Sequence, residues 1–230
     1  MKGSPLRNRR EFFDEALVLA KAGAVSLLIE SADIRPGVTV DEDVLGKKSV
    51  DLVLHQTLDS RRGLDLLLAR KDVDPKRVAF VGHSYNANVG AILSGVEKRF
   101  KAFVLMAGGI SDKEIMHADD PEIIKWRETV GEARLKEYEQ NYGWLDAANY
   151  VGHAAPAAVL LQYARNDGLL TEKRERYFFS LVSQPKDLKF YEATHALNAE
   201  ARWDRFEWLR QQLALKPLAR AVVDSVPQVK

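Results

Sequence analysis

Short apolar runs alternate with longer amphipathic segments along most of the 230-residue chain. The apolar runs have the length of buried strands, whereas the amphipathic segments repeat their apolar residues with the period of a helix. The predicted strands cover residues 24–29, 78–81, 102–106, 157–163 and 187–191. The predicted helices cover residues 9–22, 46–70, the segment after Ser84, 171–181 and 197–213. This alternation predicts an α/β fold with a mostly parallel sheet that is covered by helices on both faces.

Two regions of the chain depart from this alternation. Residues 111–150 are charged and helical in pattern, and we expect them to form an insertion over the carboxyl ends of the strands. Two roles stay open for it: a lid in which Trp126, Tyr142 and Trp144 line a substrate pocket, or a helical excursion whose rings pack on the body. Residues 1–213 are expected to form one domain and residues 214–230 a C-terminal tail, which we expect to be loosely held after Pro217.

The composition fits a globular domain and argues against several classes of function. The formal net charge is +1, so the chain lacks the basic surface that binds nucleic acid or acidic membranes. The absence of cysteine excludes disulfides, a thiolate nucleophile and cysteine-ligated metals, and the histidines have no metal-binding spacing, so we expect no cofactor and no metal. No apolar stretch approaches the roughly 20 residues of a membrane helix, and the polar N-terminus lacks the apolar core of a signal peptide, which favours a cytoplasmic location.

Residues 78–86 have the pattern of a strand, a sharp turn and a helix, with Ser84 at the turn. A serine hydroxyl is a weak nucleophile at neutral pH, and hydrolases activate it on such a turn, beside an imidazole base and amide donors. Gly82 lets the backbone pass close to the turn, and the N–H of Tyr85 is predicted to point at the developing oxyanion. Asn86 replaces the usual second glycine of the G-x-S-x-G motif, and asparagine tolerates unusual backbone angles.

Two further residues follow Ser84 in the order nucleophile, acid, histidine. Asp167 comes directly after the predicted strand 157–163, and His195 lies in the loop after the predicted strand 187–191. Because the carboxyl ends of parallel strands meet at one edge of a sheet, we expect the three side chains to converge there. Ser84 is then the nucleophile, His195 the general base and Asp167 the group that orients the imidazole. Each residue also has a structural alternative: a helix N-cap, a turn former and a structural histidine.

Three segments carry a resemblance to a known family. They are residues 72–78 leading into Gly82-His83-Ser84, residues 155–160 leading to Asp167, and Thr194-His195 after the last strand. The sequence resembles the dienelactone hydrolase-like and prolyl oligopeptidase-like branch of the α/β-hydrolase superfamily over most of its length. The resemblance implies a cofactor-free serine hydrolase that acts on small-molecule carboxylic esters or related acyl compounds, with the triad above and an acyl-enzyme, and we expect His83 to border the substrate pocket. Relatives that cleave peptides usually carry an additional domain, for which the chain has no room, and dienelactone hydrolases proper use a cysteine nucleophile, which it lacks.

The front of the chain departs from the family pattern. Members typically have three strands before the helix that is predicted here from residue 9, and the loop after the third strand supplies the second oxyanion donor. Residues 1–4 resemble the end of that loop, so we expect an N-terminally incomplete fold. The strand that is missing lies between residues 24–29 and 78–81 in the family. The remaining strands are then expected either to close the gap or to pair with another chain, for example in a homo-oligomer, because open strand edges invite pairing. A noncatalytic scaffold that acts in assembly or binding is therefore the alternative to an active esterase.

Overall fold

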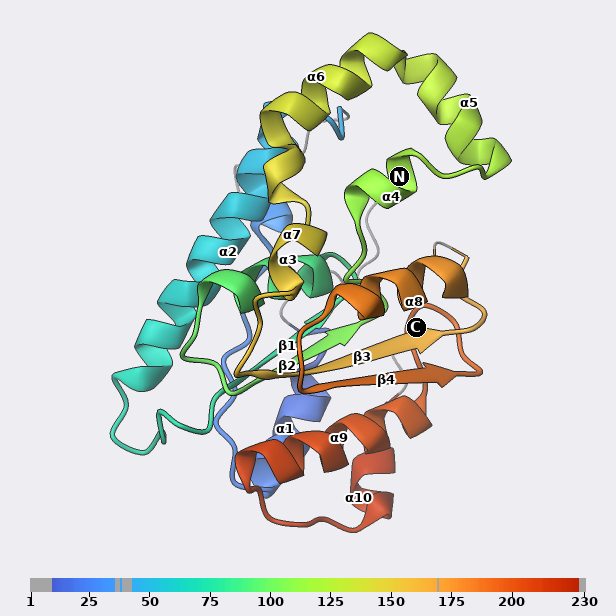
Figure 1. Ribbon diagram of the computed structural model, residues 1–230. Coiled ribbons are helices and arrows are strands. Elements are labelled where there is room, and N and C mark those ends of the chain that lie inside the picture. Colours follow the sequence, from blue (N-terminus) through green and yellow to red (C-terminus); the bar gives the residue numbers. More distant parts are fainter. Residues whose placement is uncertain (1–9, 36–37, 39–42, 169, 228–230) are drawn as a thin grey trace.

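The centre of the molecule is a four-stranded sheet in which every strand is parallel to its neighbours (Figure 1). The computed structural model describes residues 10–35, 38, 43–168 and 170–227. The strands are β1 (Ala79–His83), β2 (Ala102–Met106), β3 (Ala158–Ala164) and β4 (Lys186–Tyr191), and they lie side by side in that order. Four of the five predicted strands are thus confirmed to within a few residues.

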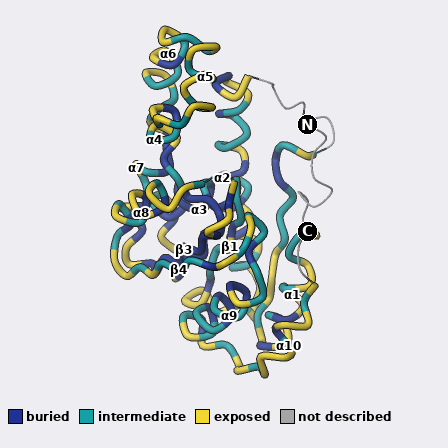
Figure 2. The backbone as a smooth tube through the Cα atoms, turned by 90° about the vertical axis from the view of Figure 1, so that its right-hand side faces the viewer, coloured by how far each residue is buried: buried dark blue, intermediate teal, exposed yellow. Residues whose placement is uncertain are grey.

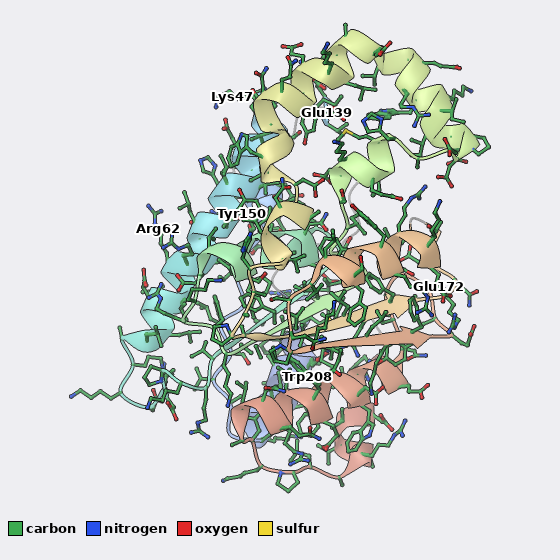
Figure 3. The ribbon with its side chains drawn as sticks, viewed as in Figure 1. Lys47, Arg62, Glu139, Tyr150, Glu172 and Trp208 are labelled. Carbon is green, nitrogen blue, oxygen red and sulfur yellow. The ribbon has the colours of Figure 1, made fainter. Side chains whose placement is uncertain are left out.

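Helices cover both faces of the sheet, as predicted (Figure 1). One face carries α2 (Lys47–Leu68), α3 (Tyr85–Val96), α7 (Ala148–Val151) and α8 (Glu172–Leu181), and the other carries α1 (Phe13–Lys21), α9 (Ala199–Leu213) and α10 (Arg220–Asp224). Successive strand residues point to opposite faces, so Phe103 and Leu105 join the core beneath α3, whereas Val104 and Met106 join the core above α9. Charged residues occupy the outer sides of the helices, as Arg62 does on α2 (Figure 3).

Helix α10, near the C-terminal end of the described residues, packs against the body. The tail after Pro217 was expected to be loosely held, but α10 contacts α1 and α9, and Val223 is buried with Val18 and Phe206. Arg202 also donates a hydrogen bond to the carbonyl of Val226 at 2.9 Å. This expectation was wrong because single apolar residues, such as Val223, give no periodic signal over so short a helix.

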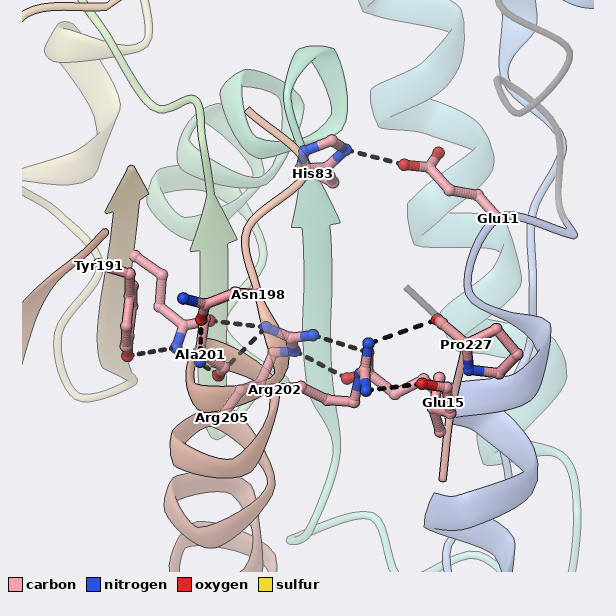
Figure 4. A network of polar contacts seen from close by, with 11 residues as sticks. Glu11, Glu15, His83, Tyr191, Asn198, Ala201, Arg202, Arg205 and Pro227 are labelled. Carbon is pink, nitrogen blue, oxygen red and sulfur yellow. Dashed lines mark hydrogen bonds and ion pairs between the residues drawn. The ribbon is translucent and has the colours of Figure 1, made fainter. Parts of the chain in front are cut away.

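A buried polar network ties α1 to α9 and to the sheet (Figure 4). Arg205 donates to both carboxylate oxygens of Glu15 at 2.7 Å and to Oε1 of Gln162 at 2.8 Å. The amide nitrogen of Gln162 in turn donates to the hydroxyl of Tyr191 and to the carbonyl of Ala201, each at 2.8 Å. A buried ion pair is tolerated only when such additional hydrogen bonds satisfy both partners. The network therefore helps to fix the position of α1, in addition to the apolar packing of Val18 and Leu19.

The insertion is helical, as predicted. It consists of α4 (Asp112–Met116), α5 (Pro121–Val130), α6 (Glu132–Tyr142) and the short turn η2 (Gly143–Leu145), and α5 and α6 form an arm that projects from the helical layer above the sheet (Figure 1). Burial is concentrated around the sheet, whereas α5 contains no buried residue (Figure 2). A small apolar cluster at the base of the arm joins Leu135 of α6 to Met116 of α4 and to Leu45, which precedes α2.

Residues 24–30, which were predicted to include a strand, form neither a strand nor a helix. They connect α1 to the short helical turn η1 (Ala32–Ile34). The prediction was wrong because a strand requires a hydrogen-bonded neighbour, and the neighbour that the family pattern places between this segment and β1 is absent from the described residues. The gap is not closed either: β1 is an edge strand, and a cavity lies between it and residues 24–29. Residues 1–4, which we compared with the oxyanion loop, lie outside the described residues.

None of the helices in the described ranges combines the length and the apolar character needed to cross a bilayer.

Candidate active site

Ser84 lies on a strained turn between β1 and α3. Its backbone angles are φ 54° and ψ −119°, a conformation that non-glycine residues rarely adopt. The surrounding backbone holds it there: the N–H of Ser84 donates to the carbonyl of Met106 at 2.8 Å, and its own carbonyl accepts from the N–H of Ala87 at 2.9 Å. Strain of this kind persists only where neighbouring contacts over-determine it, and it is found most often at functional sites.

Two glycines make this turn sterically feasible. A Cβ atom on Gly82 would lie 2.3 Å from the carbonyl oxygen of Asn86, and a Cβ atom on Gly108, after β2, would lie 2.3 Å from the carbonyl oxygen of Ser84. Both approaches are shorter than any real Cβ contact, so only glycine fits at either position. Asn86, at the place of the second motif glycine, turns its side chain away from the strand and donates to Ser31 Oγ at 3.3 Å.

The structure brings Ser84, Asp167 and His195 into one hydrogen-bonded chain. His195 Nε2 is 2.9 Å from Ser84 Oγ, and His195 Nδ1 is 2.7 Å from Asp167 Oδ2. Asp167 follows β3 and His195 follows β4, so the carboxyl ends of neighbouring strands carry both residues toward the serine. The fold thus converges three residues that lie as much as 111 positions apart in the sequence.

Burial differs sharply among the three side chains. The side chain of Asp167 is 0% exposed, whereas that of His195 is 31% exposed and Ser84 is half-buried. A buried carboxylate that accepts from one imidazole nitrogen holds the ring and leaves the other nitrogen free to accept the serine proton. The N–H of Tyr85 is the first amide of α3 and has no hydrogen-bond partner among the residues described, so it is available to an anion at the start of the helix.

Several solved structures with a similar architecture are named as esterases or hydrolases. The structure matches an acetyl xylan esterase from Paenibacillus sp. R4 with a TM-score of 0.70 at 20% sequence identity, covering 91% of this chain and 70% of that one. It matches the alpha/beta hydrolase GrgF from Penicillium sp. sh18 with a TM-score of 0.64 at 15% identity, covering 91% and 87% of the two chains. The esterase Pf2001 from Pyrococcus furiosus gives a TM-score of 0.60 at 17% identity, over 87% and 76%. The chain has the α/β-hydrolase fold. No protein-family model matches the sequence, and a search of curated proteins finds no match to it.

In this α/β-hydrolase fold, His83 supports the histidine loop. Its Nε2 lies 2.9 Å from the carbonyl oxygen of His195, and its Nδ1 lies 2.8 Å from a carboxylate oxygen of Glu11 (Figure 4). Both partners are acceptors, so both hydrogen bonds form together only when each ring nitrogen carries a hydrogen. We expected His83 to border a substrate pocket; it lines the cavity beside β1, and its two hydrogen bonds link Glu11, which precedes α1, to the backbone of His195.

Two residues near the site, Glu11 and Glu175, were not predicted from the sequence. Glu11 is one, because an acidic residue near the start of a predicted helix is commonplace. Glu175 is the other: it is 1% exposed on α8, and its Oε1 has no hydrogen-bond partner. Burial first, and then the nearby charges of Asp167 and Glu172, raise the pKa of Glu175 to about 7. A glutamate in an amphipathic helix pattern gives no sign that it will face inward.

The aromatic residues of the insertion do not join the triad. Trp126 packs with the apolar cluster of the arm, and Tyr142 packs against the main core with its ring 5.8 Å from that of Tyr138. Trp144 is 50% exposed and donates to the carbonyl of Asn141. Within the described ranges, no hydrogen bond or ring contact connects these three side chains to Ser84 or His195, which favours the excursion over the lid.

Among the described residues, no group of three histidine or carboxylate side chains has the arrangement that holds a metal ion.

Proposed function

We propose that the protein is a serine hydrolase that cleaves small-molecule carboxylic esters, with Ser84 as nucleophile, His195 as general base and Asp167 as the orienting acid. The observation that carries the proposal is the continuous hydrogen-bonded chain from Ser84 Oγ through His195 to Asp167. The strained backbone of Ser84 supports the same activity, and so does the N–H of Tyr85, which has no hydrogen-bond partner among the described residues. The names of the similar solved structures, which include an acetyl xylan esterase, favour an ester as the substrate class.

The geometry suggests the following sequence of steps. Ser84 Oγ attacks the acyl carbon while its proton moves to His195 Nε2, and Asp167 stabilises the positive imidazolium ring. The negative oxygen of the tetrahedral intermediate accepts a hydrogen bond from the N–H of Tyr85. His195 then delivers the proton to the alcohol oxygen as the carbon–oxygen bond breaks, which leaves an acyl group on Ser84. Water, activated by the same imidazole, attacks this acyl-enzyme and releases the carboxylic acid.

Covalent labelling with a fluorophosphonate probe tests the nucleophile directly. We expect the folded protein to be labelled and Ser84→Ala to be unlabelled, with Ser180→Ala, an exposed serine on α8, as the matched control that keeps full labelling. A series of p-nitrophenyl esters of increasing acyl length then measures turnover, which the Ser84→Ala substitution is expected to reduce by about 10⁴-fold or more. Labelling that persists in Ser84→Ala would assign the reactivity to another residue.

A noncatalytic scaffold is the second candidate, and the open edge of β1 favours it. Among the described residues, the N–H of Tyr85 is the one oxyanion donor that we identify, and the loss of a second donor typically reduces the rate of a hydrolase by about 10²–10³-fold. An absence of labelling in protein that is folded by circular dichroism would favour this candidate over the esterase.

A further inference from the structure

A buried glutamate lies near the triad and has no part in the steps described above. Glu175 is on the first turn of α8, only 1% of the residue is exposed, and its Oε1 has no hydrogen-bond partner. Burial of a carboxyl group costs free energy unless a cation or hydrogen bonds compensate for the lost water. Glu175 is therefore a buried titratable group that the proposed mechanism leaves unexplained.

The cations around Glu175 are engaged with other partners. Arg165 and Arg176 each donate to Glu172 at 2.7 Å. Their side chains are 43% and 57% exposed, so water weakens their effect on a buried group. Two further cations beside α8 also have partners of their own, Arg174 in the insertion and Lys186 at the carbonyl of Phe179. Within the described ranges, Glu175 thus forms no ion pair.

The groups that face Glu175 from β3 and from the loop after it are neutral or negative. Tyr163 on β3 is 0% exposed, and its hydroxyl donates to the carbonyl of Gly109 at 2.8 Å. Asp167, with a fully buried side chain that is paired with His195, lies close enough for its charge to act on Glu175. Burial and then this charge raise the pKa of Glu175 to about 7. Two carboxyl groups that share a buried pocket resist carrying two charges, so below about pH 7 the pair carries one negative charge, on Asp167.

We propose that Glu175 is a positioning residue of the triad, which acts through the buried carboxylate of Asp167 on the charge of His195. The inference rests on the proposed function, in which the proton of Ser84 moves to His195 during the attack. The ring stands between Asp167 and Ser84, so its positive charge develops beside the carboxyl pair. An ionised Glu175 adds a second negative charge on the side of Asp167, which stabilises the imidazolium more than the neutral ring and lowers the barrier. Hydrolysis is therefore faster when both carboxyl groups are ionised.

The pH dependence of kcat separates this role from a purely structural one. Glu175→Gln keeps the shape of the neutral acid but cannot ionise. We expect its kcat for a p-nitrophenyl ester to equal that of wild type at pH 6 and to be about threefold to tenfold lower at pH 8.5, whereas Glu175→Asp recovers the rise. Glu200→Gln, an exposed glutamate on the first turn of α9, is the matched control and should follow wild type at both pH values, because water and salt screen its charge. A ratio of Glu175→Gln to wild type that stays constant or increases with pH would overturn the proposal.

Nitrogen-15 NMR of the histidine rings tests the coupling without turnover. The chain has five histidines, and the signals of His195 are those that disappear in His195→Gln. We expect these signals to follow a two-step curve in wild type, with one step near pH 7 that reports the ionisation of Glu175, and a one-step curve in Glu175→Gln. Glu175→Leu, which fills the same space with an apolar side chain, should give the same one-step curve and replaces Glu175→Gln if that variant does not fold. A one-step curve in wild type, or two steps in the variants, would overturn the inference. If the two-step curve is present but no ester is turned over, the coupling stands and the proposed function fails.

Discussion

The two sides of the sheet differ although their sequences are alike. Every residue of β2 and β3 is buried, whereas in β1 only Gly82 is, and the equally apolar residues 24–29 form no strand at all. We call β2 to β4 with α8 and α9 the closed half, and β1 with residues 24–30 the open half. Hydrophobic sequence is therefore not sufficient to make a strand: the backbone needs a hydrogen-bonded neighbouring strand, and residues 24–29 have none among the described residues.

The candidate active site spans this division. Ser84 ends the edge strand of the open half, while Asp167 and His195 follow strands of the closed half. The acid thus follows an inner strand, β3, whereas the nucleophile and the histidine follow the two edge strands, β1 and β4.

Asp167→Asn tests whether the acid of the closed half is needed for the reactivity of Ser84 in the open half. We expect this substitution to have the largest effect on catalysis. An amide keeps the shape of the side chain, but it does not reproduce the carboxylate that accepts from Nδ1 of His195, so the ring loses its correct tautomer. We expect kcat for p-nitrophenyl esters to fall by about 10⁴-fold with little change in thermal stability. Asp74→Asn, in the turn before β1, is the control and should keep its activity. An unchanged kcat in Asp167→Asn would mean that the reactivity of Ser84 does not depend on the acid of the closed half.

Glu175→Gln tests whether Glu175 is buried in the closed half. The measured quantity is the pH dependence of the free energy of unfolding. The pKa of Glu175 is raised from 4.5 to about 7, so the folded state binds this proton more tightly than the unfolded state. The stability contributed by the neutral acid is full below pH 4.5 and is lost as the pH rises to about 7, by about 3 kcal/mol at most. Urea unfolding of wild type and variant from pH 4.5 to 8 should show a smaller loss in Glu175→Gln.

Glu128→Gln, an exposed glutamate on α5, is the matched control and should follow the wild-type pH profile. Identical profiles for wild type and Glu175→Gln would mean that Glu175 is hydrated in solution and that the closed half is less tightly packed around it.

Val81 and Val104 offer the most direct comparison and the smallest effects. They are register partners on β1 and β2, yet Val81 is 39% exposed and Val104 is 0% exposed. We expect Val104→Ala to lower the free energy of unfolding by about 2 kcal/mol and Val81→Ala by less than about 1 kcal/mol, because the second substitution removes methyl groups that are already partly in water. Equal losses would show that something covers β1 in solution.

Much of the fold follows from local patterns in the sequence. The strand at residues 102–106 was predicted with its observed bounds, and the other three strands of the sheet differ by a few residues, because continuous apolar runs bounded by turns are a strong signal. Ser84, Asp167 and His195, which the structure brings together, were predicted as a site because each follows a predicted strand. The wrong strand at residues 24–29 has the same local signal, and only the absence of a neighbour, a property of the tertiary structure, distinguishes it.

Contacts between elements that are distant in the sequence could not be predicted from sequence patterns. Nothing near Glu11 indicates that it pairs with His83, 72 positions away, and the packing of Trp126 and Tyr142 depends on the direction in which their rings point. The assignment to the dienelactone hydrolase-like and prolyl oligopeptidase-like branch, the domain limits and the cytoplasmic location stay predictions.

The separate apolar cluster of the arm has a consequence for unfolding. Leu45, Met116 and Leu135 share no buried member with the cores that flank the sheet, and α5 contributes none of its own. A region with so few buried contacts opens at a lower free energy than the sheet and forms a cooperative unit of its own. Sub-global melting of the arm would then precede global denaturation, and the indole of Trp126, which packs in that cluster, would report it while the triad is still assembled.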